Sequence, residues 1–288
     1  MWIQLKLDVK RQQVDLISEV LSALGSLSLT FSDTHDNPIF EPPVGDTPIW
    51  DNTTITALFE NTIDKKHIKN SLEEICDIEQ FDFSEVADKK WELESIADFK
   101  PMLFGDNIWV VPSWCSDFKA PKNAIVLDLD PGLAFGTGTH QTTSLCLEYL
   151  DKNSPKGLTV VDYGCGSGIL AIAAAKLGAK KVFAIDNDPQ AVQATKDNAL
   201  KNGVSIEVYL NTNEPKITCD LLLANILAKP LQNLAPHFTP MIKNKGVIVL
   251  AGLLNEQKQA VKSAYQQDFI FKKSLKKGDW TRLLGIKK

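Results

Sequence analysis

The segment of this sequence best suited to ligand binding is a short glycine-rich run that follows an acid. Three glycines alternate in residues 164–168, Gly-Cys-Gly-Ser-Gly, and Asp162 stands two positions before the first. Glycine adopts positive φ angles and lets a ligand approach the backbone where a Cβ atom would collide. A dinucleotide fingerprint needs its third glycine where this chain has Ile169, whereas alternating glycines after an acid are typical of S-adenosylmethionine sites. The cofactor contacts expected here are Asp162, Gly164, Gly166 and Gly168.

A second acid follows at the distance where a cofactor ribose is usually bound. Asp186 ends the apolar stretch 181–186, 18 residues after the last glycine of the run. A carboxylate at this place accepts hydrogen bonds from the two ribose hydroxyls. We therefore expect Asp186 to bind the cofactor and Asp188 to cap the helix that begins at Pro189. The alternative for the glycines is an ordinary tight turn, and the two acids favour cofactor binding.

An amide follows the next buried stretch. The apolar residues 220–224 predict a strand that delivers Asn225 to the carboxyl end of the sheet, where ligands of open α/β sheets bind. Its side chain offers one acceptor and one donor group. Many methyltransferases of amino groups place an aromatic residue beside this amide to clamp a planar base, and this chain has none there. The pattern favours a flexible aliphatic amine as the target, with a strand-end cap as the alternative for Asn225.

Residues 131–143 form a polar run rich in small residues. They contain three glycines and four threonines but no lysine, so the run is not a phosphate-binding P-loop. Such a segment could fold over a ligand. His140 could act as a base because its unperturbed pKa of ~6.5 suits proton transfer, or it could simply begin a helix.

Strands and helices alternate in the part of the chain that holds these residues. Continuous apolar strands separated by amphipathic helices indicate a parallel sheet covered on both faces. The predicted strands are 159–162, 181–186, 220–225 and 247–251, and the predicted helices are 169–177 and 189–202. Near the end, 269–271 and 280–286 read as an antiparallel hairpin around Lys-Lys-Gly-Asp. The fold class is therefore α/β, with a Rossmann-like domain over residues 101–288.

The first third predicts a smaller domain of a different kind. Its expected strands are 2–9, 27–31, 55–59 and 78–83, and its expected helices are 14–24 and 63–75. The order βαββαβ is that of a ferredoxin-like α+β sandwich. Four prolines in 37–51 indicate a surface loop. We place this domain at residues 1–85 and a helical linker at 86–100.

Charge is distributed unevenly over the 288 residues. Residues 1–100 carry 9 Lys or Arg against 20 Asp or Glu, although the whole chain has a net charge of only −5. An acidic domain repels nucleic acid and attracts a basic macromolecule, and the alternative is that its acids only keep a small domain soluble; in both cases no specific nucleic-acid binding is expected. The five cysteines are widely spaced, which argues against a disulfide framework or a metal site. No apolar run is long enough to span a membrane and no export signal is visible, so we expect the cytoplasm.

Taken together, these segments resemble the ribosomal protein L11 methyltransferase family. The resemblance is carried by the run 127–143, the loop 160–170 and 224–228, Ala-Asn-Ile-Leu-Ala, and it extends to Trp91 and to the opening 2–5. It implies a seven-stranded class I methyltransferase domain behind a substrate-recognition domain on a flexible linker. It also implies that the enzyme uses S-adenosylmethionine to methylate lysine ε-amines and the N-terminal α-amine of ribosomal protein L11.

The resemblance also assigns roles to single residues. It places Thr143, Gly164, Asp186 and Asn225 at the cofactor, and we expect Asn225 to be catalytic by aiming the amine. Gln141 and Lys229 depart from the family pattern, in which a proline and a small residue are usual. The alternatives are a methyltransferase of RNA or of a small molecule, a nucleotide-binding oxidoreductase of similar fold, and a binding protein without catalysis.

Overall fold

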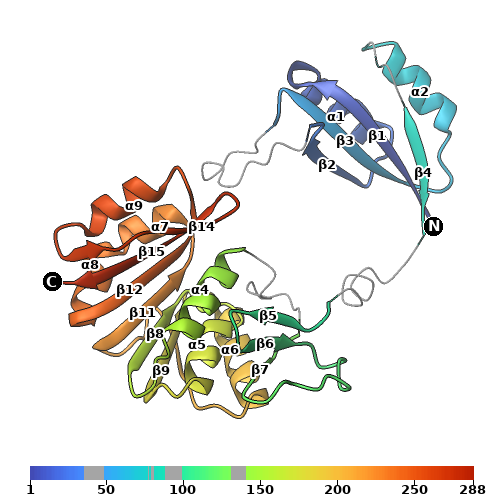
Figure 1. Ribbon diagram of the computed structural model, residues 1–288. Coiled ribbons are helices and arrows are strands. Elements are labelled where there is room, and N and C mark those ends of the chain that lie inside the picture. Colours follow the sequence, from blue (N-terminus) through green and yellow to red (C-terminus); the bar gives the residue numbers. More distant parts are fainter. Residues whose placement is uncertain (36–48, 77, 79–80, 88–98, 131–140) are drawn as a thin grey trace. The chain divides into compact units, whose positions relative to one another are not determined.

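The computed structural model describes residues 1–35, 49–76, 78, 81–87, 99–130 and 141–288 (Figure 1). The chain divides into two compact units, Met1–Glu94 and Ser95–Lys288, and each is described by itself. Most of the expected linker 86–100, with Trp91, lies outside the described residues, as does His140.

The first unit is a four-stranded antiparallel sheet with two helices. Its strands are ordered β2-β3-β1-β4. The elements are β1 (Trp2–Lys10), α1 (Val14–Ala23), β2 (Ser28–Asp33), β3 (Asn52–Glu60), α2 (Lys65–Glu73) and β4 (Asp82–Val86), with a short 3-10 turn at Arg11–Gln13. Alternate residues of β1, from Ile3 to Val9, are buried and belong to one core with Ile17 of α1 and Leu72 of α2. The expected βαββαβ order is confirmed.

The last strand of this unit begins later than expected. The alternating pattern predicts 78–83, but β4 covers Asp82–Val86. The reason is its register, because β4 pairs with the first half of β1, where Asp82 lies opposite Lys6 and Val86 opposite Trp2. Ile78 is buried in the core without belonging to the strand.

The second unit contains the predicted Rossmann-like sheet. Its path is β10-β9-β8-β11-β12-β15-β13, with β14 paired to β15. The first five strands of this path run parallel, and β15 is antiparallel to its neighbours. The strands are β8 (Thr159–Tyr163), β9 (Lys181–Asp186), β10 (Glu207–Leu210), β11 (Cys219–Asn225), β12 (Ile242–Leu254), β13 (Phe269–Phe271), β14 (Leu275–Lys277) and β15 (Trp280–Lys287). The tight turn after Lys277 joins β14 to β15, and β13 pairs with the far end of β15 on the same edge as β14, opposite β12.

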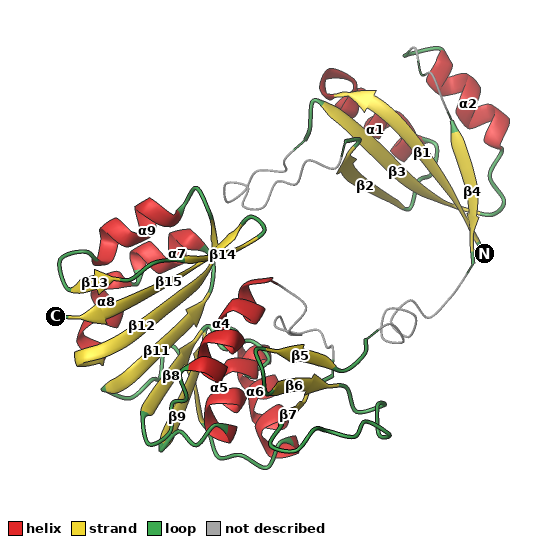
Figure 2. Ribbon diagram, viewed as in Figure 1, coloured by secondary structure: helices red, strands yellow, loops and turns green. Residues whose placement is uncertain are grey.

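Helices cover both faces of this sheet (Figure 2). One face packs against α4 (Gln141–Lys152) and α5 (Ile169–Lys176), and α6 (Pro189–Lys201) contacts α5 and β9. The other packs against α7 (Ala228–Asn233), α8 (Ala235–Met241) and α9 (Lys258–Tyr265). No described helix is long and apolar enough to cross a membrane.

A second, three-stranded sheet precedes this one in the chain and was not predicted. It contains β5 (Met102–Phe104), β6 (Ile108–Val111) and β7 (Ile125–Asp128), in the order β5-β6-β7. Strand β6 is antiparallel to β5 and parallel to β7. Phe104, Ile108 and Leu127 belong to the same core as α4 and α5, so this small sheet is part of the second unit.

Candidate active site

Three polar residues of the site end neighbouring strands on one face of the large sheet. Asp162 of β8 lies opposite Ala184 of β9 and Leu223 of β11. Asp186 and Asn225 each stand two residues further along those strands. Since side chains of a strand alternate between faces, all three point to the same side. This is the face covered by α4 and α5, because Ala184 and Leu223 belong to that core.

The glycine loop is fixed to the carboxylate of Asp186. Gly166 N donates to Asp186 Oδ2 at 2.9 Å, and Asp188 N donates to Oδ1 at 3.0 Å. A carboxylate has about four acceptor positions, so Asp186 keeps capacity for a ligand's hydroxyls. Asp188 in turn accepts from Gln190 N at 2.8 Å, which confirms the expected helix cap.

The loop needs its glycines for two physical reasons. All three have positive φ angles, 77° at Gly164, 55° at Gly166 and 80° at Gly168, where side chains are strained. A Cβ atom on Gly164 would also overlap the side chain of Ile226, and one on Gly168 would lie 2.8 Å from Thr195 Cγ2. The loop therefore brings bare backbone to the edge of the sheet.

Asp162 presents an unusual buried carboxylate. Its Oδ2 accepts from Ala171 N at 3.0 Å, while its Oδ1 is buried and accepts no hydrogen bond from the described residues. The pKa of Asp162 is raised to about 7, because burial and, to a smaller extent, the charge of Asp186 raise it by more than the hydrogen bond from Ala171 lowers it. A cation beside Oδ1 would compensate the buried charge.

Asn225 and Thr143 meet at the same edge. Asn225 Nδ2 donates to Thr143 Oγ1 at 3.2 Å, and Thr143 is buried in the first turn of α4. Asn225 Oδ1 is also buried and has no hydrogen-bond partner in the described part of the chain. The structure thus offers two unused acceptor atoms, Asp162 Oδ1 and Asn225 Oδ1, on one face.

These acceptor atoms and the bare backbone of the glycine loop fit an adenosyl sulfonium cofactor. A positive ligand suits the buried carboxylate of Asp162, a ligand with hydroxyls suits Asp186, and the bare backbone at Gly164 permits close approach. The particular cofactor contacts expected for Thr143, Asp162, Gly164, Gly166, Gly168, Asp186 and Asn225 stay predictions.

The structure also describes the two residues that depart from the family pattern, Gln141 and Lys229. Gln141 begins α4, and a Cβ atom on Gly278 would lie 2.5 Å from its Oε1, so its amide contacts the β14–β15 turn. Lys229 is exposed in the first turn of α7.

Sequence reasoning missed the side chains that hold the glycine loop from behind. Thr195 Oγ1 donates to Gly166 O at 3.0 Å, and Asn198 Nδ2 donates to Ser167 O at 2.9 Å. Thr195 and Asn198 are three residues apart, so they share one face of α6. The available signal was the presence of polar residues on the inward face of an amphipathic helix.

Comparison with known proteins gives one consistent result. A family model described as ribosomal protein L11 methyltransferase (PrmA) matches residues 1–288. The ribosomal protein L11 methyltransferase of Shewanella halifaxensis is 47% identical over 293 residues, which cover 100% of this chain and 99% of the relative. That of Enterobacter sp. is 46% identical with the same coverage. The solved ribosomal protein L11 methylase of Lactobacillus delbrueckii subsp. bulgaricus is 33% identical, with a TM-score of 0.61, over 66% of this chain and 100% of its own.

Proposed function

This chain belongs to the ribosomal protein L11 methyltransferase family, and from that premise we propose that it methylates amines of ribosomal protein L11. It is an S-adenosylmethionine-dependent protein methyltransferase. We propose that the groups that accept the methyl are lysine ε-amines and the N-terminal α-amine of L11. The observation that supports an amine as the methyl acceptor is the buried Oδ1 of Asn225, which has no partner within the described residues.

In this proposal the cofactor lies along the carboxyl ends of β8, β9 and β11. S-adenosylmethionine, when bound, supplies an electrophilic methyl group on a positively charged sulfur. Asp186 would accept hydrogen bonds from the ribose hydroxyls, and the backbone of 164–168 would contact the cofactor at close range. Asp162 would stabilise the positive charge of the methionine end, because its Oδ1 is a buried acceptor that none of the described residues pairs with. Thr143 would close the site from α4.

Asn225 would orient the attacking amine. The amine of a lysine must be neutral to attack, and burial in the site lowers its ordinary pKa of ~10.4. Asn225 Oδ1 would accept one N–H of the neutral amine and thereby aim the nitrogen lone pair at the methyl group. The protein forms no covalent bond in this reaction, so its contribution is orientation and the exclusion of water. After transfer the amine is a cation, and it must release a proton before a second methylation.

The first unit would recognise the protein substrate. Residues 1–100 carry an excess of eleven negative charges, which attracts basic proteins such as those of the ribosome. We assign substrate recognition to residues 1–85, connection to 86–100 and catalysis to 101–288. Because L11 is made and assembled in the cytoplasm, we place the activity there.

A labelling experiment tests the proposal. The purified chain is incubated with S-adenosylmethionine carrying a labelled methyl group and with separate pools of ribosomal proteins, ribosomal RNA and small metabolites. The proposal predicts label in L11, located on amines by peptide mapping. Label confined to RNA or metabolites would contradict the substrate class, and nicotinamide-dependent oxidation without methyl transfer would contradict the reaction.

A further inference from the structure

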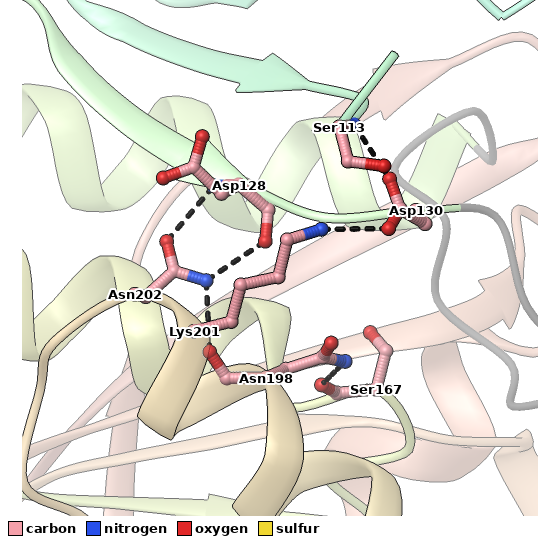
Figure 3. Close-up of polar contacts among 7 residues, drawn as sticks. All are labelled: Ser113, Asp128, Asp130, Ser167, Asn198, Lys201 and Asn202. Atoms are coloured by element: carbon pink, nitrogen blue, oxygen red, sulfur yellow. Dashed lines mark hydrogen bonds and ion pairs between the residues drawn. The ribbon is translucent and has the colours of Figure 1, made fainter.

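One edge of β7 pairs with no described strand, and side chains bind its backbone groups instead. On one side β7 pairs with β6. On the other, Asn202 Oδ1 accepts from Asp128 N at 2.8 Å and Asn202 Nδ2 donates to Asp128 O at 2.9 Å (Figure 3). Lys176 Nζ donates to Val126 O at 2.6 Å on the same strand. A single amide thus satisfies both backbone groups of Asp128, as a neighbouring strand would.

Three further contacts stabilise the same end of α6. Lys201 Nζ forms an ion pair with Asp130 Oδ2 at 2.6 Å, and Asp130 Oδ1 accepts from Ser113 N at 2.6 Å. Asn202 Nδ2 also donates to Asn198 O at 2.9 Å. Asn202 is 8% exposed, so its bonds are shielded from water and stronger than surface contacts.

One turn earlier, α6 holds the glycine loop. Asn198 Nδ2 donates to Ser167 O at 2.9 Å, as Figure 3 shows, and Thr195 Oγ1 donates to Gly166 O at 3.0 Å. The N-terminal end of the helix is tied to Asp186 through the backbone of Asp188. The helix is therefore fixed at its beginning to Asp186, in its middle to the loop and at its end to β7.

We propose that Asn198 and Asn202 are positioning residues of the cofactor site, acting through the glycine loop and not by contact with substrate. Helix α6 has 13 residues and behaves as a rigid rod about 20 Å long, at ~1.5 Å per residue. When Asn202 holds its end on β7, the helix cannot pivot about Asp188. Gly166 and Ser167 then keep one distance from Asp186. The proposal rests on the function proposed above, in which this loop and Asp186 bind one cofactor.

Loss of the two hydrogen bonds between Asn202 and Asp128 should weaken cofactor binding. Asn202→Ala removes both bonds to Asp128, and the exposed ion pair of Lys201 with Asp130 that remains holds the end of α6 less firmly against β7. Misplacement of the glycine loop by about 1 Å weakens its contacts with the cofactor, so the dissociation constant for the cofactor rises roughly ten- to a hundredfold. The turnover number at saturating cofactor falls less than about threefold, because Asn225 and the amine are untouched by the change.

Matched variants separate positioning from general stability. Asn153 Nδ2 donates to Tyr149 O at 3.0 Å, the same i−4 contact that Asn202 makes to Asn198, so Asn153→Ala removes that contact alone. Lys243→Gln removes an ion pair to Asp220 of 2.7 Å and is the control for Lys201→Gln. Lys201→Arg keeps the ion pair to Asp130 and should restore the affinity that Lys201→Gln loses.

Calorimetric titration of S-adenosylhomocysteine into each variant is the test, with thermal unfolding of the ligand-free proteins measured alongside. The inference predicts weakened binding in Asn202→Ala and Asn198→Ala, and wild-type binding in Asn153→Ala and Lys243→Gln. If Asn202→Ala does not fold, the inference is tested by Asn198→Ala and by the comparison of Lys201→Gln with Lys201→Arg. Equal affinities, with only the unfolding temperature lowered, would overturn the inference. A wild-type protein that binds no S-adenosylhomocysteine would overturn the proposed function as well.

Discussion

Asn225 at the end of β11 donates from Nδ2 to Thr143 Oγ1 in the first turn of α4 at 3.2 Å, across 82 residues of sequence. This hydrogen bond fixes the orientation of the amide, because Nδ2 donates to Thr143. The Oδ1 of Asn225 remains buried and without a partner in the described chain. A buried acceptor left unpaired costs about 1–3 kcal/mol, which a bound amine would recover.

Replacement of Asn225 should therefore affect catalysis more than cofactor binding. In Asn225→Ala we expect kcat to fall about a hundredfold, because the amine is no longer aimed. The dissociation constant for S-adenosylmethionine should change less than threefold. Thr143→Val, which removes the Oγ1 acceptor and keeps the shape, should give an intermediate loss of kcat. Steady-state kinetics and calorimetry measure both quantities, and an equal loss of both in Asn225→Ala would make Asn225 a cofactor contact only.

Asp186 should determine the affinity for the cofactor. In Asp186→Asn, the hydrogen bonds from Gly166 N and from a ribose lose their charged acceptor. Hydrogen bonds to charged groups contribute about 1.5–3 kcal/mol, so the dissociation constant should rise roughly ten- to a hundredfold. The matched control is Asp188→Asn, because asparagine caps a helix as well as aspartate does. If Asp188→Asn weakens binding as much as Asp186→Asn, the effect belongs to the helix and not to a ribose contact.

The buried carboxylate of Asp162 predicts a dependence on pH. Its pKa is raised from 3.8 to about 7, so the folded protein binds this proton more tightly than the unfolded chain. The free energy of unfolding should therefore fall as pH rises between 3.8 and about 7. Asp162→Asn should remove this part of the pH dependence, which urea unfolding at several pH values would measure. Identical pH profiles for both proteins would show that Asp162 keeps an ordinary pKa.

The affinity for the cofactor should increase over the pH range in which the free energy of unfolding falls. A positively charged ligand favours the ionised carboxylate, so affinity for S-adenosylmethionine should increase as pH rises through about 7. The amino group of the cofactor also titrates near neutral pH. This titration affects binding to the wild type and to Asp162→Asn alike, so the variant serves as the control. The prediction concerns the difference between the two proteins, and a difference that is constant over pH would contradict it.

The acidic surface of the first unit should steer the substrate. Asp15, Glu19 and Glu74 are exposed on or beside its helices, and changing all three to lysine should raise the KM for L11. The increase should be largest at low salt, because ionic strength screens exposed charges. Changing Asp117, Glu256 and Asp268 of the second unit to lysine alters the net charge equally and serves as the control. Equal effects of the two sets on KM would refute steering by the first unit.

The glycine loop and its acids could be predicted from sequence because their signals are local. Gly164 and Gly168 occupy backbone conformations that other residues rarely adopt, so their types reveal the loop directly. Asp162 and Asp186 lie near the carboxyl ends of apolar strands, which predicts one edge of the sheet for both, whereas the register that places them on one face comes from the structure. The βαββαβ order of the first unit and the strands β8, β9, β11 and β12 of the second were predictable for the same reason.

The supporting structure could not be predicted because it depends on distant pairs. Asn202 and Asp128 are 74 residues apart, and nothing near either residue indicates the other. Strand β10 (Glu207–Leu210) has an intermediate burial pattern without alternation, so its sequence carries no strand period. The small sheet β5-β6-β7 consists of strands of three or four residues, which are too short for a periodic signal.

The methyl transfer to amines of L11 can be followed by intact-mass spectrometry of purified L11, incubated with S-adenosylmethionine and either the wild-type protein or Asn225→Ala. We expect L11 to gain mass in steps of one methyl group with the wild type, and far more slowly with Asn225→Ala at saturating cofactor. An unchanged mass of L11 with the wild-type protein, or the same rate with Asn225→Ala, would contradict this expectation.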